Sequence, residues 1–198
     1  NDEQGLCEVV TLVAADFRAV VDLCFQCKLC YVKCPYTPPH EWALDFPRLM
    51  LRSRAVRARR DGVLLQDKIL GEPDWLGRAG TGAFAPLANL TRKVRAGREL
   101  MHRVAGIHRD FNLPEFARET FVDWFQKHTP ASEAGRAGEV AMFYTCSFNY
   151  NAPKVARAAV EVLERNGLRV VVPEQRCCGM PNLDGGDVEA ATDKARDN

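Results

Sequence analysis

Four cysteines within eleven residues constrain this chain more than any other feature of its sequence. They are Cys24, Cys27, Cys30 and Cys34, spaced C-x2-C-x2-C-x3-C, and Pro35 follows directly. This is the bacterial ferredoxin run that holds a 4Fe–4S cluster. Three thiolates two residues apart can wrap one loop around a cuboidal cluster, and the backbone N–H groups of so tight a loop point at the sulfurs. The spacing therefore predicts at least one 4Fe–4S cluster.

The fourth cysteine of this run suggests a second cluster. In two-cluster ferredoxins the cysteine before the proline binds the other cluster, so we expect Cys34 to serve a sister site. The chain holds no second copy of the run, and we expect the missing copy to lie upstream of Asn1, in a longer protein. The prediction is thus one or two 4Fe–4S clusters. Cys7 has no partner at motif spacing and is either a further ligand or an ordinary thiol.

Two other uses of these cysteines fit the sequence less well. A structural zinc site needs two separated ligand pairs, whereas here three cysteines crowd into one turn with no histidine at zinc-finger spacing. A disulfide framework needs an oxidising compartment, and the polar start of the chain does not resemble a secretory signal. A zinc scaffold without redox chemistry nevertheless stays an alternative, and it would give colourless, iron-free protein.

The first two thirds of the chain have the pattern of a helical segment. Apolar residues at helical spacing predict a helix from about residue 11 into the cysteine loop, and a basic helix over 45–60. Prolines near the start of the next two patterns predict helices over 86–104 and 114–128. Glycines predict loops at 62, 71–73 and 77–82, and a linker at 129–138 ends this part.

The last third has a different pattern. Residues 139–146 (EVAMFYTC) and 168–173 (LRVVVP) are short apolar runs typical of strands, and between them 153–166 predicts an amphipathic helix closed by Gly167. Strand, helix and strand in about 35 residues predict parallel strands. The fold class we expect is α+β: a mainly helical ferredoxin-type segment (1–44), a helical basic connector (45–130) and the start of an α/β domain (138–198).

A second cysteine group falls in this α/β part. We expect Cys146 to end the first strand, and Cys177, Cys178 and Gly179 follow the second. Ligands bind at the carboxyl ends of parallel strands, so these three thiols should converge at one edge of the sheet. Neighbouring cysteines rarely bond to each other, and Gly179 allows the backbone to present both to one metal cluster. The alternative is a set of buried structural thiols.

Both cysteine groups together resemble a known family. Cys146 with Cys177-Cys178-Gly179 resembles the opening half of the cysteine-rich CCG domain, found in heterodisulfide reductases, the glycolate oxidase iron–sulfur subunit and the C subunit of anaerobic glycerol-3-phosphate dehydrogenase. The order of ferredoxin motif, helical segment and CCG domain is similar to that family's order. The stretch from Cys34 to Trp42 (CPYTPPHEW) also resembles iron–sulfur oxidoreductases. A complete CCG domain adds a CxxC pair, which this chain lacks.

The resemblance implies a function. It implies an iron–sulfur electron-transfer subunit that takes electrons from a flavoprotein dehydrogenase and passes them to a quinone or another acceptor. The alternative it implies is catalysis at the CCG site, as in heterodisulfide reduction. A second type of iron–sulfur cluster would then be held by Cys146, Cys177 and Cys178 with downstream cysteines.

The distribution of charge along the sequence limits the kinds of partner that we expect for this chain. The net charge is only +1, but residues 48–109 carry +9 while the stretches before and after each carry −4. This basic middle suits docking to an acidic partner or peripheral association with a membrane, or else it is a solvated helix face. No motif that reads nucleic acid accompanies it, so we expect no nucleic-acid partner. We expect a cytoplasmic location, with the inner face of the cell membrane as the alternative.

Two further patterns carry little weight. His40-Glu41 is not followed by a second histidine at metalloprotease spacing, which disfavours a zinc hydrolase. Gly77, Gly80 and Gly82 resemble a phosphate-binding loop only superficially, because no predicted strand precedes them.

Overall fold

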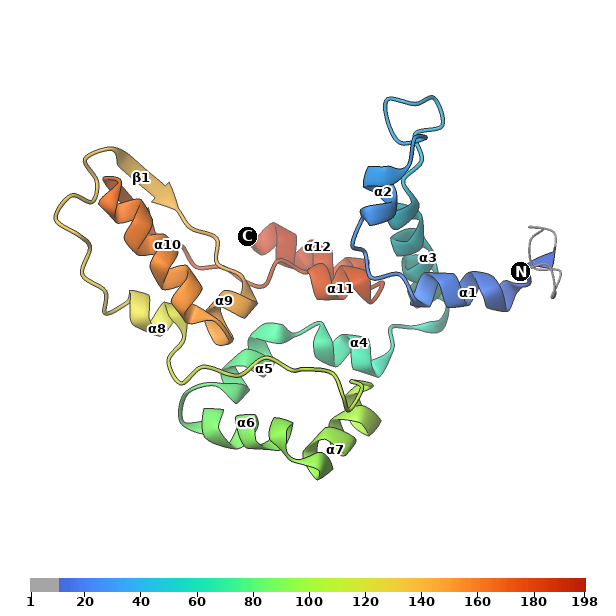
Figure 1. Ribbon diagram of the computed structural model, residues 1–198, viewed down its shortest axis with the longest axis horizontal. Coiled ribbons are helices and arrows are strands. Elements are labelled where there is room, and N and C mark those ends of the chain that lie inside the picture. Colours follow the sequence, from blue (N-terminus) through green and yellow to red (C-terminus); the bar gives the residue numbers. More distant parts are fainter. Residues whose placement is uncertain (1–10) are drawn as a thin grey trace. The chain divides into compact units, whose positions relative to one another are not determined.

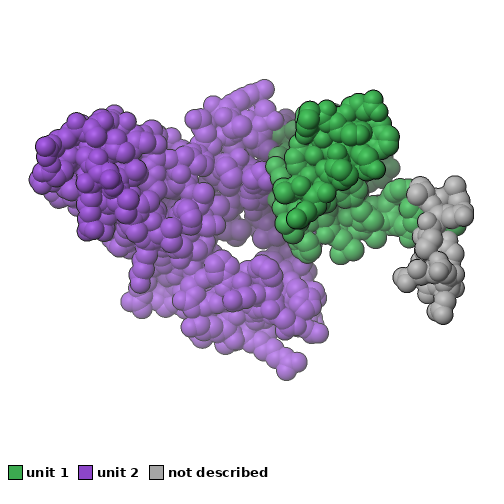
Figure 2. Space-filling model, turned by 45° about the horizontal axis from the view of Figure 1, so that its top comes forward, with its two compact units in different colours: residues 1–64, 183–188 green, residues 65–182, 189–198 purple. Residues whose placement is uncertain are grey.

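The computed structural model describes residues 11–198. Cys7 lies outside the described residues, so its role stays a prediction. The chain divides into two compact units, residues 1–64 with 183–188 and residues 65–182 with 189–198 (Figure 2). The structure is α+β, with many helices and one two-stranded sheet in the described part. Between residues 11 and 198, no helix combines the length and the apolar character needed to cross a membrane.

The first unit is helical. Its helices α1 (Ala14–Asp22) and α2 (Leu29–Lys33) both pack against α3 (Phe46–Asp61). The carboxylate of Asp45 caps α3 by accepting from the Arg48 N–H at 2.9 Å. Gly62 ends α3, and its φ of 86° is a backbone conformation that glycine adopts without steric cost. The basic helix predicted over 45–60 is therefore confirmed.

The second unit begins with a group of short helices. They are α4 (Leu65–Leu70), α5 (Pro73–Gly80), the 3-10 helix η3 (Gly82–Phe84), α6 (Ala85–Lys93) and α7 (Arg95–Ala105), all seen in green tones in Figure 1. The loop predicted at 77–82 is wrong in its first part, because Gly77 and Gly80 belong to α5 and are buried. The single helix predicted over 86–104 is also wrong, because the chain breaks at Val94.

The rest of the second unit is the α/β part. Apart from residues 183–188, which belong to the first unit, it contains α8 (Phe121–Phe125), β1 (Gly138–Ala141), α9 (Cys146–Tyr150), α10 (Pro153–Arg165), β2 (Leu168–Val171), α11 (Met180–Asp184) and α12 (Val188–Asp197). The helix predicted over 114–128 is reduced to the five residues of α8. Strands β1 and β2 are parallel, with Val140 opposite Val170, as the sequence predicted. Helix α10 also matches its prediction, and Gly167 with φ of 81° turns the chain into β2.

The core of this unit lies where α8 and α10 meet the sheet. Phe121, Ala156, Val160 and Val170 are buried there, and the side chains of Trp124, Phe125 and Tyr144 surround them. Helix α10 packs against both α8 and β2. The α/β part therefore has an apolar core of its own, which supports the loops that carry its cysteines.

Candidate iron–sulfur sites

The first cysteine group lies on the turn between α1 and α2 and on α2 itself. Cys24 and Cys27 are in the turn, Cys30 is in α2, and Cys34 is the residue that ends α2. Two non-glycine residues between the first three cysteines, Gln26 and Lys28, have positive φ angles of 54° and 59°. Such left-handed positions reverse the chain within a few residues. The backbone is thus folded into the tight loop that the cysteine spacing requires.

Helix α3 holds this loop in place. The guanidinium of Arg54 donates to the carbonyl oxygens of Val21 (2.8 Å) and Cys24 (2.7 Å). Its other end donates to the carbonyl oxygen of Asp184 at 3.0 Å. One residue of the basic helix is therefore directed inward and fixes the backbone beside the first cysteine, instead of facing a partner. Sequence reasoning missed this role, because nothing in the pattern separates Arg54 from the other arginines of the helix.

Gln26 gives one thiol a polar partner. Its Nε2 donates to the sulfur of Cys24 at 3.2 Å and to the carbonyl oxygen of Pro47 at 3.2 Å. N–H groups directed at cysteine sulfur stabilise the negative charge of a thiolate or of a cluster and help to set its reduction potential. Gln26 stands between two predicted ligands, so its position in the motif was a signal that could have found it.

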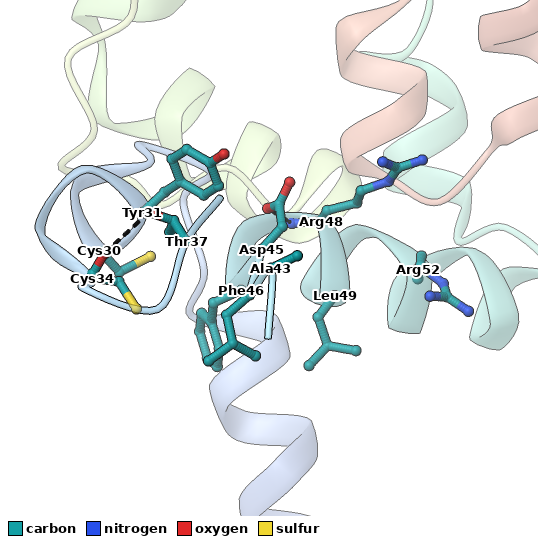
Figure 3. A pocket seen from close by; sticks show the side chains of 11 residues that line it. Cys30, Tyr31, Cys34, Thr37, Ala43, Asp45, Phe46, Arg48, Leu49 and Arg52 are labelled. Carbon is teal, nitrogen blue, oxygen red and sulfur yellow. Dashed lines mark hydrogen bonds between the residues drawn. The ribbon is translucent and has the colours of Figure 1, made fainter. Parts of the chain in front are cut away.

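A cavity of about 640 Å³ adjoins the second half of the cysteine run. Cys30 and Cys34 line this cavity together with Phe46 and Leu49 of α3. Figure 3 shows the thiols of the two cysteines at the edge of the cavity. The Thr37 hydroxyl donates to the Cys34 carbonyl oxygen at 3.1 Å and fixes the chain where it leaves α2. The last two cysteines of the run therefore face a shared, mainly apolar space.

The donor set fits an iron–sulfur cluster. All four sulfurs are free thiols, with Cys24 and Cys34 half-buried and Cys27 and Cys30 exposed. Within residues 11–198, no three Cys, His, Asp or Glu side chains are gathered tightly enough for a single metal ion. A zinc ion draws four ligands to about 2.3 Å of one centre, whereas a cuboidal cluster offers a separate iron to each thiolate. The run supplies four thiols that can meet the second demand.

The chain after Cys34 forms an aromatic group. The rings of Tyr36 and Trp42 lie 4.8 Å apart between centroids, and His40 packs edge-on at 5.2 Å from each. His40 thus contacts both of these aromatic rings.

The second cysteine group is in the α/β part. Cys146 is the first residue of α9, so the prediction that it ends the first strand is wrong, since β1 stops at Ala141. Cys146 and Cys177 still come together, because their thiols share a hydrogen bond. Cys177 is only 4% exposed, whereas its neighbour Cys178 is exposed. The structure therefore pairs two of the three predicted ligands and leaves the third beside them at the surface.

The hydrogen bond divides the acidity of the pair unequally. Accepting it from Cys177 lowers the pKa of Cys146 to about 7, and the N–H of Ser147 acts in the same direction. Donating to Cys146 raises the pKa of the Cys177 thiol, and burial raises it further. The thiol of Cys146 is therefore the more acidic of the two.

Asp74 of α5 connects the helical group to this site. One carboxylate oxygen accepts the Cys177 N–H at 2.8 Å, and the other accepts the Tyr150 hydroxyl at 3.4 Å. The negative charge of Asp74 also contributes to a raised pKa at Tyr150, where burial is the larger cause. Sequence reasoning missed Asp74, because it lies 103 residues before Cys177 and no local pattern marks it.

Comparison with known proteins identifies both cysteine regions. Residues 4–61 match the Fer4-like domain of citrate utilization protein B, and residues 140–198 match the cysteine-rich CCG domain. No solved structure matches the chain.

Two curated relatives match different lengths of the chain. The C subunit of anaerobic glycerol-3-phosphate dehydrogenase from Escherichia coli K12 is 29% identical over 214 residues, covering 87% of this chain and 52% of that protein. Lactate utilization protein A of Bacillus thuringiensis is 46% identical over 54 residues, covering 27% of this chain and 23% of that protein. The chain thus spans about half the length of the first relative. The chain thus carries matches to a Fer4-like domain and to a CCG domain, which support the binding of iron–sulfur clusters.

Proposed function

We propose that this chain is part of an electron-transfer subunit that accepts electrons from a flavoprotein dehydrogenase and passes them to a quinone or another acceptor. The observation that carries the proposal is the cysteine loop of the first unit, whose left-handed turn and N–H-to-sulfur contact suit a 4Fe–4S cluster. Its match to a Fer4-like domain and the similarity to a dehydrogenase subunit support the same function. A bound cluster supplies one-electron transfer.

The residues take separate roles in this proposal. Cys24, Cys27 and Cys30 would hold one cluster, and Cys34 would bind a sister cluster whose other ligands lie outside this chain. Gln26 would donate to sulfur, and Arg54 would fix the loop backbone. Cys146, Cys177 and Cys178 would contribute to a second type of iron–sulfur cluster in the CCG domain. The division into 1–44, 45–130 and 138–198 is part of the proposal.

The proposed docking surface is narrower than the basic middle of the sequence. In α3, Arg54 is used inside the unit, Arg57 pairs with Asp22 at 2.7 Å, and Arg60 pairs with Asp61 at 2.7 Å. These contacts reduce the positive charge that α3 can offer an acidic partner protein or a membrane surface. Arg48 and Arg52, which line the cavity beside Cys30 and Cys34, are better placed to meet a partner at the cluster. A cytoplasmic location, or one at the inner membrane face, is the corresponding proposal for the protein.

The test is anaerobic purification of the intact gene product, with iron and sulfide analysis and EPR of the reduced form. Cys27→Ser should lower the iron content by the amount that one 4Fe–4S cluster contains and should remove the EPR signal of that cluster, because a serine oxygen replaces a thiolate ligand. Val32→Ser is the matched control, since it introduces the same side chain at an exposed apolar residue of α2, within the same cysteine run. A Cys27→Ser protein with the iron content of the wild type would contradict the assignment.

A second candidate function rests on the CCG cysteines. The hydrogen bond between the Cys146 and Cys177 thiols, with exposed Cys178 adjacent, favours thiol–disulfide chemistry of the heterodisulfide reductase type. If the reduced protein turns over a disulfide without a flavoprotein, catalysis at this site is the function. If the reduced protein only passes electrons between a flavoprotein and an acceptor, electron relay is the function.

A further inference from the structure

Gln26 combines two unfavourable local features. Its φ of 54° lies in the left-handed region, which residues other than glycine and asparagine rarely adopt. Its Oε1 is buried and has no hydrogen-bond donor among residues 11–198, and a buried acceptor without a partner costs stability. Features of this kind gather at functional sites, where the surrounding structure compensates for them. The conformation of Gln26 therefore costs stability, and the contacts of its amide nitrogen give the reason.

The amide nitrogen of Gln26 holds a donor against sulfur. Nε2 carries two hydrogens, and it donates to the sulfur of Cys24 and to the carbonyl oxygen of Pro47, each at 3.2 Å. The Pro47 oxygen can only accept, so it fixes which end of the amide faces the sulfur. With the amide turned over, its oxygen would face another oxygen and a cluster-bound thiolate. Pro47, at the start of α3, therefore directs an N–H group at the sulfur of a predicted cluster ligand.

The Cys24 side of the loop is also its less solvated side. Cys24 is half-buried, whereas Cys27 and Cys30 are exposed. Arg54 donates to the Cys24 carbonyl oxygen at 2.7 Å, and its guanidinium stays positively charged at any physiological pH. Water screens charges and dipoles less in a half-buried place than at an open surface. An N–H dipole and a positive charge therefore act on Cys24, while the other two sulfurs are open to solvent.

We infer that Gln26 is a positioning residue that acts through Cys24 and raises the reduction potential of the cluster held by Cys24, Cys27 and Cys30. The inference rests on the electron relay proposed above and names the residue that tunes it. Uptake of an electron makes the ligand sulfurs more negative, so an N–H group directed at one of them stabilises the reduced form more than the oxidised form. The charge of Arg54 acts in the same direction. Gln26 thus makes the relay a better acceptor of electrons.

The experiment is a redox titration of the intact, anaerobically purified protein, followed through the EPR signal that Cys27→Ser removes. Gln26→Leu removes the N–H donor without adding charge. It should lower the ratio of reduced to oxidised cluster at a fixed potential about tenfold, a shift of about 59 mV for one electron. Gln26→Glu keeps the shape of the side chain and should lower the potential further, because a negative charge beside the sulfur disfavours the reduced form. Gln126→Leu makes the same change at an exposed residue just after α8 and should leave the potential unchanged.

Iron content and unfolding in urea are measured on the same samples. A glutamine with only a packing role would change these two properties and leave the potential as it is, so an unchanged or raised potential in Gln26→Leu would overturn the inference. If Gln26→Leu does not hold its cluster, Gln26→Asn replaces it, because asparagine tolerates a positive φ and its shorter side chain places the amide farther from the sulfur. The same downward shift is expected there.

Loss of the cluster in all three Gln26 variants would show that Gln26 only supports assembly, which also overturns the inference. Intact clusters with an unchanged potential contradict this inference alone, whereas iron-free wild-type protein contradicts the relay itself.

Discussion

At the scale of single residues, Asp74 supports the second cysteine group, although no sequence motif marks it. Its two carboxylate oxygens accept from the Cys177 N–H and the Tyr150 hydroxyl, and Tyr150 is itself buried. One side chain of α5 therefore fixes the backbone of a predicted ligand and the orientation of a ring in α9. Loss of this carboxylate should leave two donors without an acceptor.

We predict that Asp74→Ala lowers the free energy of unfolding by about 1–3 kcal/mol, the usual cost of an unsatisfied buried polar group. Urea denaturation followed by circular dichroism measures it. Asp74→Asn retains an oxygen acceptor and should recover most of the loss. An Asp74→Ala protein that unfolds at the urea concentration of the wild type would show that the two contacts do not stabilise the site.

Gln26 and Arg54 show which contacts of the cysteine loop could be predicted from the sequence and which could not. The cysteine spacing alone located the loop, because the geometry of a cuboidal cluster dictates the spacing. The contact of Arg54 with the Val21 and Cys24 carbonyl oxygens joins residues about 30 positions apart. Such a contact depends on how α3 packs against α1 and is invisible in a local pattern.

At the scale of elements, α12 fixes the segment that carries Cys177. Lys194 is 1% exposed, and its Nζ donates to the Gly71 carbonyl oxygen (2.5 Å) and to the Asn182 side-chain oxygen (2.8 Å). Glu72 adds an ion pair at 3.0 Å. Just after α12, Asn198 accepts from the Arg176 N–H at 2.8 Å, next to Cys177. The helix therefore links the α4–α5 turn to the cysteine segment.

Replacing Lys194 with methionine should detach this link. We predict a loss of about 1–3 kcal/mol, because two buried oxygens lose their donor while the half-exposed Glu72 can be solvated. Hydrogen exchange of residues 172–180 should rise at the same time. Lys154→Met, on the exposed face of α10, is the control and should change neither measurement. Unchanged exchange in Lys194→Met would mean that α12 does not hold the cysteine segment.

Two helix predictions failed at this scale, one at a local break and one because of distant contacts. The chain breaks at Val94 where Gly97 meets α6 so closely that a Cβ would lie 2.2 Å from the Thr91 carbonyl oxygen. Residues before α8 are not helical because their backbone bonds elsewhere, Phe116 through both its N–H and its carbonyl to the Asn89 side chain and Ala117 to the Tyr150 carbonyl. Contacts with distant residues replaced the local hydrogen bonds in this second segment.

At the scale of the whole molecule, the two units differ in what supports them. The second has an apolar core around Phe121 and Val160. In the described part of the first, few side chains are buried, and several apolar residues of the cysteine loop stay exposed, such as Phe25 at 90%. A small unit with little apolar burial depends on metal binding for part of its stability.

Removal of iron should therefore affect the units unequally. Treatment of the intact protein with a chelator under reducing conditions should greatly increase hydrogen exchange in residues 11–64, whereas the protected amides of β1, β2 and α10 should change little. Mass spectrometry of peptic peptides measures both in one sample. The Cys27→Ser protein should show the same pattern without chelator. An equal increase in both units, or none in residues 11–64, would contradict this prediction.

The local features of the fold follow from the residue pattern alone. The cysteine run folds into a tight loop because its spacing matches a cluster, and the alternation of strand, helix and strand gives parallel β1 and β2 because only a crossover joins them that way. Which distant groups meet is set by the tertiary packing. It paired Cys146 with Cys177 and brought Asp74 to both Cys177 and Tyr150. These contacts arise from packing between elements far apart in the chain, on which local spacing carries no information.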